Sequence, residues 1–235
     1  MALTIREICR YPVKSLGGEV IETANVGVHG IEGDRQWGIR DLATDLILTA
    51  RREPELLMAS SRFFEGGVAI RLPDGRDTDD DADLSSWLGR DVALVRASKD
   101  AGGTFENPMD AENDADWISW TGPSGSLHDS TKTMLSLAST LTIGGWDRRR
   151  FRKNLIAEGS GEDELVGRIV QIGSCSASVT KKIDRCVMVT RPQPGFERDL
   201  DVLRTINKSR DRRLGIGMLI TEPGVIAVGD QVIAL

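Results

Sequence analysis

Short stretches in which apolar and polar residues alternate make up most of the first part of the chain. In the opening stretch, Leu3 and Ile5 alternate with polar residues before the pattern slips to Ile8. Gly-rich turns separate such stretches, and a spacing of roughly 8–12 residues is typical of a sheet or barrel rather than of alternating strands and helices. The pattern predicts strands over 3–10, 19–28, 37–41, 45–50, 68–72 and 92–96, and short helices over 55–61 and 84–88.

Residues 98–127 show a different pattern. They are acidic and rich in Gly, Pro and Asn, and they sustain no apolar period. This composition is typical of a linker or a long surface loop. Trp117 and Trp120 are the exception, because two aromatic side chains three residues apart usually dock on another surface. We expect them to hold the acidic segment as a lid over a neighbouring cleft.

The second half of the chain predicts two helices and a further set of strands. Residues 132–140 carry apolar side chains at helical spacing, with Ser130 or Thr131 as N-cap and Gly144-Gly145 as the end of the helix. The second helix is predicted over 200–208. Strands are predicted over 154–157, 168–172, 177–181, 217–221, 225–228 and 231–234.

These elements together predict a mainly β fold of the α+β class with a few short helices. We expect an N-terminal domain over 1–97, an acidic linker or lid over 98–127 and a C-terminal domain over 128–235. With 40% hydrophobic residues in a chain of 235, each domain has enough apolar side chains for a packed core. Because clefts between domains are common ligand sites, we expect the functional site there.

The composition limits which cellular compartment and which kinds of metal site we expect. No apolar run approaches the ~20 residues that cross a bilayer, and the N-terminus lacks the pattern of a signal peptide. Three cysteines make a disulfide framework improbable, so we expect a cytoplasmic protein without a membrane partner. Two histidines and three scattered cysteines exclude a multi-histidine metal site and a cysteine-held iron–sulfur cluster.

The net charge of −6 hides an uneven distribution. Residues 74–116 contain 13 of the acidic residues and 4 of the basic ones, a local charge of −9, so the rest of the chain carries +3. This basic remainder is compatible with an anionic small molecule. The acidic isoelectric point of about 5.1 and the scarcity of aromatic residues among the basic segments exclude a nucleic-acid partner.

The first segment that could carry chemistry is YPVKSLGG at 11–18. Lys14 and Ser15 follow a predicted strand and precede a Gly-Gly turn. A cation, a hydroxyl group and exposed backbone amides together suit an oxyanion such as phosphate. The alternative is an ordinary hairpin with a solvated lysine.

The second segment is GGWDRRRFRKNLI at 144–156, where five basic residues precede a strand. If the chain is extended from Phe151, alternation places Arg152 on the opposite face of the sheet. A buried arginine needs a partner for its charge, so Arg152 and Asn154 could face a bound anion. The alternative is a solvated charge run, which suits 148–150 better than Arg152.

The third segment is KKIDRCVMVTRP at 181–192, which places Cys186 at the start of a predicted strand beside basic residues. A positive environment favours the thiolate, the form that binds metals or attacks electrophiles. The alternative is a small buried hydrophobic residue. Cys9 and Cys175 lack a comparable cluster of basic residues in the sequence and are interpreted as packing residues. Phosphate-loop, zinc-protease, nucleophile-elbow and paired-cysteine motifs are absent from the sequence.

Together these segments resemble the MOSC superfamily, the molybdenum cofactor sulfurase C-terminal domain, preceded by its N-terminal β-barrel domain. The N-terminal part is similar through YPVKSLGGE (11–19), GIEGDRQW (30–37) and SWLGRDVALVR (86–96). The C-terminal part is similar through HDSTKTMLSLAS (128–139), RFRKNLIAEG (150–159), GEDEL (161–165), RCVMVTRPQPG (185–195) and GVIAVGDQV (224–232). The architecture is similar to that of the mitochondrial amidoxime-reducing component and its bacterial relatives. The resemblance implies an N-terminal barrel-like domain packed on a MOSC β-barrel.

The resemblance also implies a cofactor and the residues that hold it. Family members bind molybdenum cofactor, a pterin dithiolene with a phosphate, and the family's cysteine, here Cys186, is implied as a direct molybdenum ligand and as the catalytic residue. A thiolate is the ligand type that suits a soft, sulfur-rich metal centre. The segments implied to hold the pterin and its phosphate contribute Lys14, Ser15, Arg35, Ser136, Ser139, Arg152, Asn154 and Arg185.

Three functional hypotheses follow from the resemblance. The first is a molybdenum-dependent reductase of N-hydroxylated small molecules that takes electrons from a separate ferredoxin- or flavin-type protein. The second is a cofactor or sulfur carrier with a persulfide on Cys186, or a pyridoxal phosphate-binding module. The third is an inactive binding module, which is favoured by three departures from the family pattern at Ile183, Thr131 and Leu165.

Overall fold

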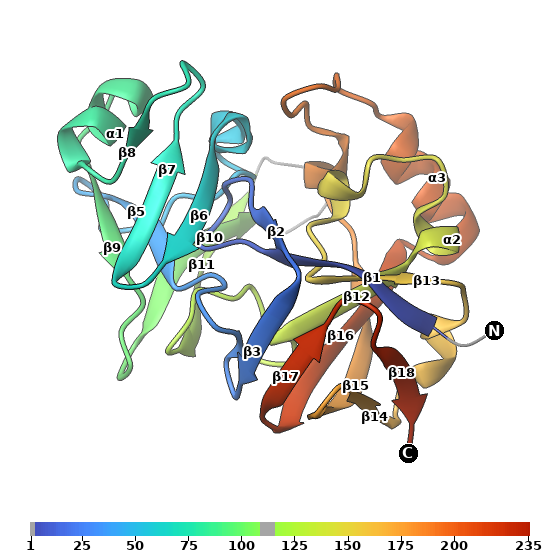
Figure 1. Cartoon of the computed structure of the whole chain (residues 1–235). Coiled ribbons are helices and arrows are strands. Elements are labelled where there is room, and N and C mark those ends of the chain that lie inside the picture. Colours follow the sequence, from blue (N-terminus) through green and yellow to red (C-terminus); the bar gives the residue numbers. More distant parts are fainter. Residues whose placement is uncertain (1–2, 109–115) are drawn as a thin grey trace.

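The computed structural model describes residues 3–108 and 116–235 and shows two lobes joined side by side (Figure 1). Strands dominate both lobes, and the helices are short, so the predicted mainly β class is confirmed. Within the described ranges no helix is both long enough and apolar enough to span a lipid bilayer.

The C-terminal lobe, which we call the barrel lobe, is built on one eight-stranded sheet. The strands follow the order β13-β12-β16-β15-β14-β18-β1-β2, and an additional β1–β13 pairing closes the sheet into a barrel. Closure leaves no long unpaired edge around the ring. The strands are β1 (Leu3–Arg10), β2 (Glu19–Ile21), β12 (Leu135–Ser139), β13 (Leu155–Glu158), β14 (Ile169–Ile172), β15 (Cys175–Asp184), β16 (Arg213–Glu222) and β18 (Gln231–Ala234).

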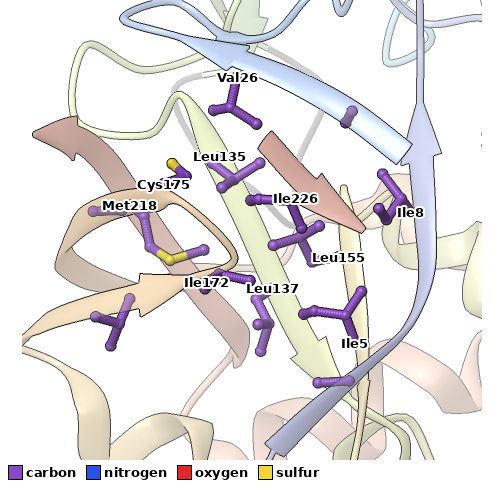
Figure 2. Packing of buried hydrophobic residues seen from close by; sticks show 14 of the residues in the cluster. Ile5, Ile8, Val26, Leu135, Leu137, Leu155, Ile172, Cys175, Met218 and Ile226 are labelled. Carbon is purple, nitrogen blue, oxygen red and sulfur yellow. The ribbon is translucent and has the colours of Figure 1, made fainter. Parts of the chain in front are cut away.

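The first strand of the chain belongs to this barrel, although the rest of the barrel comes from the C-terminal half. β1 lies between β13 and β18 and pairs antiparallel with both, and a register shift between Ile5 and Glu7 bends it. Ile5 and Ile8 point into the barrel interior, where they pack with Leu137 and Leu155 (Figure 2). The barrel therefore needs both ends of the chain.

The N-terminal lobe consists of small antiparallel sheets around a second apolar core. β5 (Trp37–Asp41) pairs with β9 (Val92–Arg96), and β7 (Gly67–Arg71) lies between β6 (Ser60–Phe64) and β8 (Asp77–Thr78). Trp37, Ile39 and Leu56 are among the residues of this core. A further small sheet of β3 (Thr23–Gly27), β4 (Gly30–Ile31) and β17 (Gly224–Ala227) again joins the two ends of the chain.

The helices are short and several begin at a side-chain cap. Asp80 caps α1 (Asp81–Leu88), Ser139 caps α2 (Thr140–Ile143), and α3 (Asp201–Arg210) buries Val202 and Ile206 against the barrel lobe. Four 3-10 helices complete the described elements: η1 (Pro54–Met58), η2 (Arg148–Phe151), η3 (Glu162–Leu165) and η4 (Val187–Thr190). The helix predicted over 200–208 is confirmed as α3.

The helix predicted over 132–140 is wrong. This segment forms strand β12, which pairs parallel with β13 and antiparallel with β16, and α2 begins only after it. Every residue of β12 is buried. A strand buried on both faces carries no alternation, so its apolar residues coincided with helical spacing.

The segment predicted as a linker over 98–127 contains two strands. β10 (Gly102–Pro108) pairs antiparallel with β11 (Trp117–Ser124), and Phe105 of β10 is fully buried. Residues 109–115 of this segment lie outside the described ranges. The predicted domain boundaries remain a prediction, and the pairing of β1 with the barrel shows that the chain crosses between the lobes more than once.

Smaller differences concern the elements around 45–64. Residues 45–50 form only an isolated bridge between Ile47 and Arg40 rather than a strand. The helix predicted over 55–61 is the 3-10 helix η1, and β6 begins directly after it. Pro54 starts η1 because its fixed backbone angle suits the first position of a helix.

Candidate functional site

A cavity of about 270 Å³ lies between the two lobes, and we call it the inter-lobe cavity. One side comes from the loop after β1 and from two arginines of the N-terminal lobe. The other side comes from β12, the segment between η2 and β13, and the end of β15. The cavity is lined by all predicted site residues except Ser139, namely Lys14, Ser15, Arg35, Ser136, Arg152, Asn154, Arg185 and Cys186.

Lys14 is buried at the cavity wall, so the alternative of a solvated hairpin lysine is wrong. Its Nζ donates to the Leu127 carbonyl at 2.9 Å and to the Asp129 carboxylate, and it lies 3.9 Å from the centre of the Phe105 ring. Burial lowers the pKa of Lys14 to about 8, although Asp129 opposes this change. Burial raises the pKa of Asp129, but the charges of Lys14, Arg51 and Arg35 and the hydrogen bond from Lys14 together outweigh it and hold that pKa below its usual value.

Arg35 and Arg152 both lie over the ring of Tyr11, 5.2 and 4.4 Å from its centre. Arg152 donates to the Leu16 carbonyl at 2.6 Å, and Arg35 pairs with Asp34. Burial lowers the pKa of Arg152 to about 10. Burial also lowers the pKa of Arg35, but Asp34, Asp129 and Tyr11 together outweigh burial, and the net change is upward. Both guanidinium groups are therefore positively charged at neutral pH.

Three cavity residues have a left-handed backbone that is uncommon outside glycine. The φ angles are 73° at Ser15, 51° at Arg35 and 51° at Arg152. Ser15 Oγ accepts a hydrogen bond from the Ala50 amide at 3.0 Å, which holds this turn in place. Arg152 follows η2 and does not belong to an extended strand, so the predicted alternation from Phe151 is wrong, and both side chains line the cavity. Backbone strain of this kind tends to gather at binding sites.

Ser136 and Asn154 form a buried polar pair that joins three strands. Ser136 Oγ donates to Asn154 Oδ1 at 2.9 Å and accepts from the Asn154 amide at 3.1 Å. Asn154 Nδ2 donates to the Cys9 carbonyl of β1 at 3.3 Å. These bonds fix the start of β13 against β12 and β1, at the barrel side of the cavity.

Ser139, which was expected at the cofactor, does not line the inter-lobe cavity and instead caps α2. Its Oγ accepts from the Thr142 amide at 3.2 Å as the N-cap of α2, and its own amide donates to Glu162. Because residues 132–140 run as a strand into a capped helix, Ser139 is carried to the far end of β12, away from the cavity.

Cys186 is a half-buried thiol between β15 and η4. The strand predicted to begin there is absent, because the backbone turns into η4 directly after the cysteine. The preceding Arg185 donates to the Phe151 carbonyl at 3.1 Å. Burial lowers the pKa of the Arg185 guanidinium.

The other two thiols have a different environment. Burial raises the pKa of both Cys9 and Cys175 to about 11. Arg148 donates to Cys9 Sγ at 3.4 Å, so the fold gives Cys9 a basic neighbour. Burial outweighs that charge, and Cys175 lies in the barrel core, so both thiols remain protonated at neutral pH.

The charge run over 148–150 is less solvated than predicted. Arg150 is buried, donates to the carbonyl groups of Val189 and Glu197 at 3.1 and 2.9 Å, and lies 4.1 Å from the centre of the Phe196 ring. It therefore ties η2 to the segment that carries Cys186.

Comparison with known families decides the identity of the fold. Residues 2–120 match the MOSC N-terminal beta barrel domain, and residues 126–233 match the MOSC domain. The chain belongs to the MOSC family. The MOSC match begins just before the loop of Asp129 and covers the barrel strands β12–β16.

Among curated proteins, this MOSC protein is similar to the "Molybdenum cofactor sulfurase" of Bombyx mori. The two are 24% identical over 277 residues, which cover 97% of this chain and 33% of the relative. The chain thus spans about a third of the length of that protein.

Two solved structures show a low similarity to the MOSC protein. The YUAD protein from Bacillus subtilis matches with a TM-score of 0.45 and 11% identity over 99% of this chain and 94% of that one. YiiM from Geobacillus stearothermophilus matches with a TM-score of 0.37 and 13% identity over 59% of this chain and 74% of that one.

The MOSC cavity also contains residues that the sequence did not single out. Lys153, Thr133 and His128 line it. Lys153 Nζ, Thr133 Oγ1 and Arg185 Nε are buried and find no hydrogen-bond partner within the described part of the chain. Lys153 lies between Arg152 and Asn154 in the basic segment 144–156, so the sequence did contain it. The expected strand alternation assigned Arg152 and Asn154 to the cavity face and left Lys153 without a function.

The chemistry of the lining fits a phosphate-bearing, sulfur-rich metal cofactor. Buried hydrogen-bond donors that have no partner in the protein are available to donate to a ligand. The basic lining residues are Lys14, Arg35, Arg51, Arg152, Lys153, Lys181 and Arg185, and the acidic ones are Asp129 and Asp184. A positive cavity with a partly exposed thiol at Cys186 thus combines an anion site with a soft metal ligand.

Proposed function

We propose that this MOSC protein binds molybdenum cofactor in the inter-lobe cavity and acts as an oxidoreductase. Its substrates are N-hydroxylated or similar N-oxygenated small molecules, and its electrons come from a separate donor protein. The observation that carries the proposal is the coexistence of unpartnered cationic donors and a half-buried thiol in a single cavity. The relative named molybdenum cofactor sulfurase supports the choice of cofactor.

The residues divide into an anion-binding group and a metal-binding group. Lys14, Arg35 and Arg152 are fixed by hydrogen bonds and by aromatic rings, so they offer charge without having to rearrange. They would hold the phosphate and pterin, and Cys186 would bind molybdenum as a thiolate. When bound, the cofactor supplies oxygen-atom transfer coupled to a change in the oxidation state of the metal.

Other residues of the cavity shape its wall. The Ser136–Asn154 pair keeps the barrel side rigid, and the burial of Phe151 excludes water from one flank. Ser15 holds the turn that presents Lys14 through its bond to the Ala50 amide. A dry, pre-arranged positive wall strengthens the attraction to an anionic ligand.

The test is the molybdenum content of protein purified from cells that make the cofactor. We expect equimolar molybdenum in the wild type and a loss of most of it in Cys186→Ala, because that change removes the thiolate ligand. Cys175→Ala is the matched control, since it makes the same change in the barrel core. Molybdenum retained in Cys186→Ala at the wild-type level would overturn the role of this cysteine.

Activity is tested separately with a chemical electron donor and an amidoxime substrate. We expect turnover by the metal-loaded wild type and none by Cys186→Ser. A loaded protein that does not reduce the substrate would contradict the reductase part of the proposal and leave the cofactor site standing.

The name of the curated relative favours a second candidate function, a sulfur carrier with a persulfide on Cys186. A thiolate beside Arg185 would also be suited to accepting sulfur. Mass spectrometry after incubation with a cysteine desulfurase and cysteine distinguishes the two. A mass increase of one sulfur atom on Cys186, with no bound molybdenum, would support the carrier over the reductase.

A further inference from the structure

Lys153 has an unusual environment for a lysine. Its side chain is 1% exposed, and its Nζ has no hydrogen-bond partner within the described part of the chain. Lysine is rarely buried without a partner, because its ammonium group then loses its hydration without compensation. The residue lines the inter-lobe cavity, so the missing partner has a place to bind.

The backbone of β16 leaves room for this side chain. Gly215 has a φ of +74°, and a Cβ atom there would lie 2.8 Å from Lys153 Cε and 3.0 Å from its Nζ. A residue with a side chain at position 215 would therefore displace the lysine. The close approach holds the amine at the floor of the cavity rather than letting it extend to solvent.

The charged groups around the amine are mostly positive. Burial is the main cause that lowers the pKa of Lys153 well below its usual value, and Arg185, Arg35 and Lys181 act in the same direction. Glu162 opposes them, but its carboxylate already accepts a hydrogen bond from the Ser139 amide. A negative ligand in the cavity would reverse this balance and favour the ammonium form.

Lys153 differs in this respect from the other cations of the cavity. Lys14 already has Asp129 as a partner, and Arg152 is a guanidinium that donates to the Leu16 carbonyl. Asp129 favours the charged form of Lys14, and the Arg152 guanidinium is charged with or without a ligand. Of these three residues, Lys153 is the one whose terminal nitrogen has no partner within the described ranges and is free for the ligand.

We propose that Lys153 is a further anion-binding residue at the floor of the inter-lobe cavity, and that an oxyanion binds there together with one proton, which the Lys153 amine takes up. The inference rests on the proposed anion-binding role of this cavity but not on molybdenum or on turnover. The proposed ligand class is a phosphate-like dianion. The amine gains a proton and becomes ammonium, and the proton comes from solvent.

Sulfate tests the proposal, because it remains a dianion throughout the neutral range and brings no proton of its own. Isothermal titration of the full chain at pH 7.5, in buffers of different ionisation enthalpy, gives the number of protons taken up with each sulfate. Lys14, with a pKa of about 8, and His128, with a pKa of about 4, also face the cavity, so the measure is the difference between wild type and variant.

We expect Lys153→Met to take up close to one proton fewer than the wild type and to bind sulfate at least about tenfold more weakly. Lys153→Arg carries a permanent charge, so it is expected to bind sulfate without the additional proton. The control is Lys208→Met, which removes an exposed lysine of α3 and is expected to match the wild type. Removing an unpartnered buried amine also leaves the variant able to fold.

Equal proton uptake and equal affinity in the wild type and Lys153→Met would overturn the proposal, as would a wild type that does not bind sulfate. A failure of this proposal can be distinguished from a failure of the proposed molybdenum cofactor function. Proton-linked sulfate binding in a protein that takes up no molybdenum would uphold the role of Lys153 and reject the cofactor.

Discussion

His128 shows at the residue scale how burial changes the chemistry of a side chain in the inter-lobe cavity. The ring is 4% exposed, and its Nε2 is 3.1 Å from the His29 carbonyl, which fits a neutral ring that donates through this nitrogen. Burial lowers the pKa of His128 to about 4, and the positive charge of Arg35 acts in the same direction. The folded protein therefore keeps this ring neutral where an unfolded chain would protonate it.

This difference predicts a loss of stability in acid. Between pH 6.5 and 4 the unfolded chain binds a proton at His128, whereas the folded protein does not. The free energy of unfolding therefore falls as the pH falls through this window. The contribution of His128 is about 3 kcal/mol over the whole window. Urea unfolding of His128→Gln at pH 7, 5.5 and 4.5 is expected to show a correspondingly smaller decline.

The matched control is His29→Gln, because His29 is exposed and contributes to the same contact only through its backbone carbonyl. We expect this control to follow the pH dependence of the wild type. An equally steep decline in His128→Gln and in the wild type would show that other groups cause the acid sensitivity.

At the scale of elements, the β10–β11 hairpin is the part of the N-terminal lobe that supports the cavity. Trp120 of β11 packs on Phe105 of β10 with ring centres 5.1 Å apart, and the other face of this small cluster contacts Ile47 and Leu127. Phe105 in turn lies under the Lys14 ammonium. Trp117 is half-buried and lies outside this cluster, with its ring centre 4.4 Å from the Arg52 guanidinium.

The two tryptophans are therefore expected to differ. Trp120→Ala removes the support of Phe105 and is expected to lower stability by about 2–4 kcal/mol and to weaken ligand retention at Lys14. Trp117→Ala, the control, is expected to cost only about 1 kcal/mol, because Trp117 lies outside the apolar cluster of Phe105 and its partner is the Arg52 guanidinium. Urea unfolding and sulfate affinity measure the two effects. Unchanged ligand retention in the double variant would reject the expectation that this segment acts as a lid.

At the scale of the whole molecule, the two lobes share strands. β1 completes the ring between β13 and β18, and β17 near the C-terminus pairs with β3 near the N-terminus (Figure 1). Strand pairings between distant segments form only when the entire ring closes, so the barrel lobe is not independent of the first 28 residues.

This arrangement predicts that residues 128–235 do not fold alone. Without β1 the fragment lacks the strand that pairs with Leu155 and fills the core with Ile5 and Ile8, and it exposes the unpaired edges of β13 and β18. We expect a chemical-shift spectrum without the dispersion of a folded β protein, whereas the full chain is expected to unfold cooperatively in urea. A fragment with dispersed resonances and a cooperative transition would show that β1 is dispensable and that the predicted boundary at residue 128 is a true domain boundary.

Much of this organisation follows from the sequence by itself. The bounds of β1, β5, β7 and β9 could be predicted almost to the residue, and in β7 the reason is burial of one face, which makes apolar and polar residues alternate. The order of the family motifs identified a MOSC protein and most of the cavity lining, because these motifs lie in the loops and strand ends that form the cavity.

Only the tertiary structure decided the rest, because it depends on which distant segments meet. β12 is buried on both faces and carries no alternation, so its strand conformation depends on β13 and β16 pairing beside it. As a result of these two pairings, Ser139 lies at a helix cap and Lys153 lies at the cavity floor beside Gly215. The local sequence determines whether a residue is polar. Its burial, its charge state and its hydrogen-bond partners depend on segments from elsewhere in the chain.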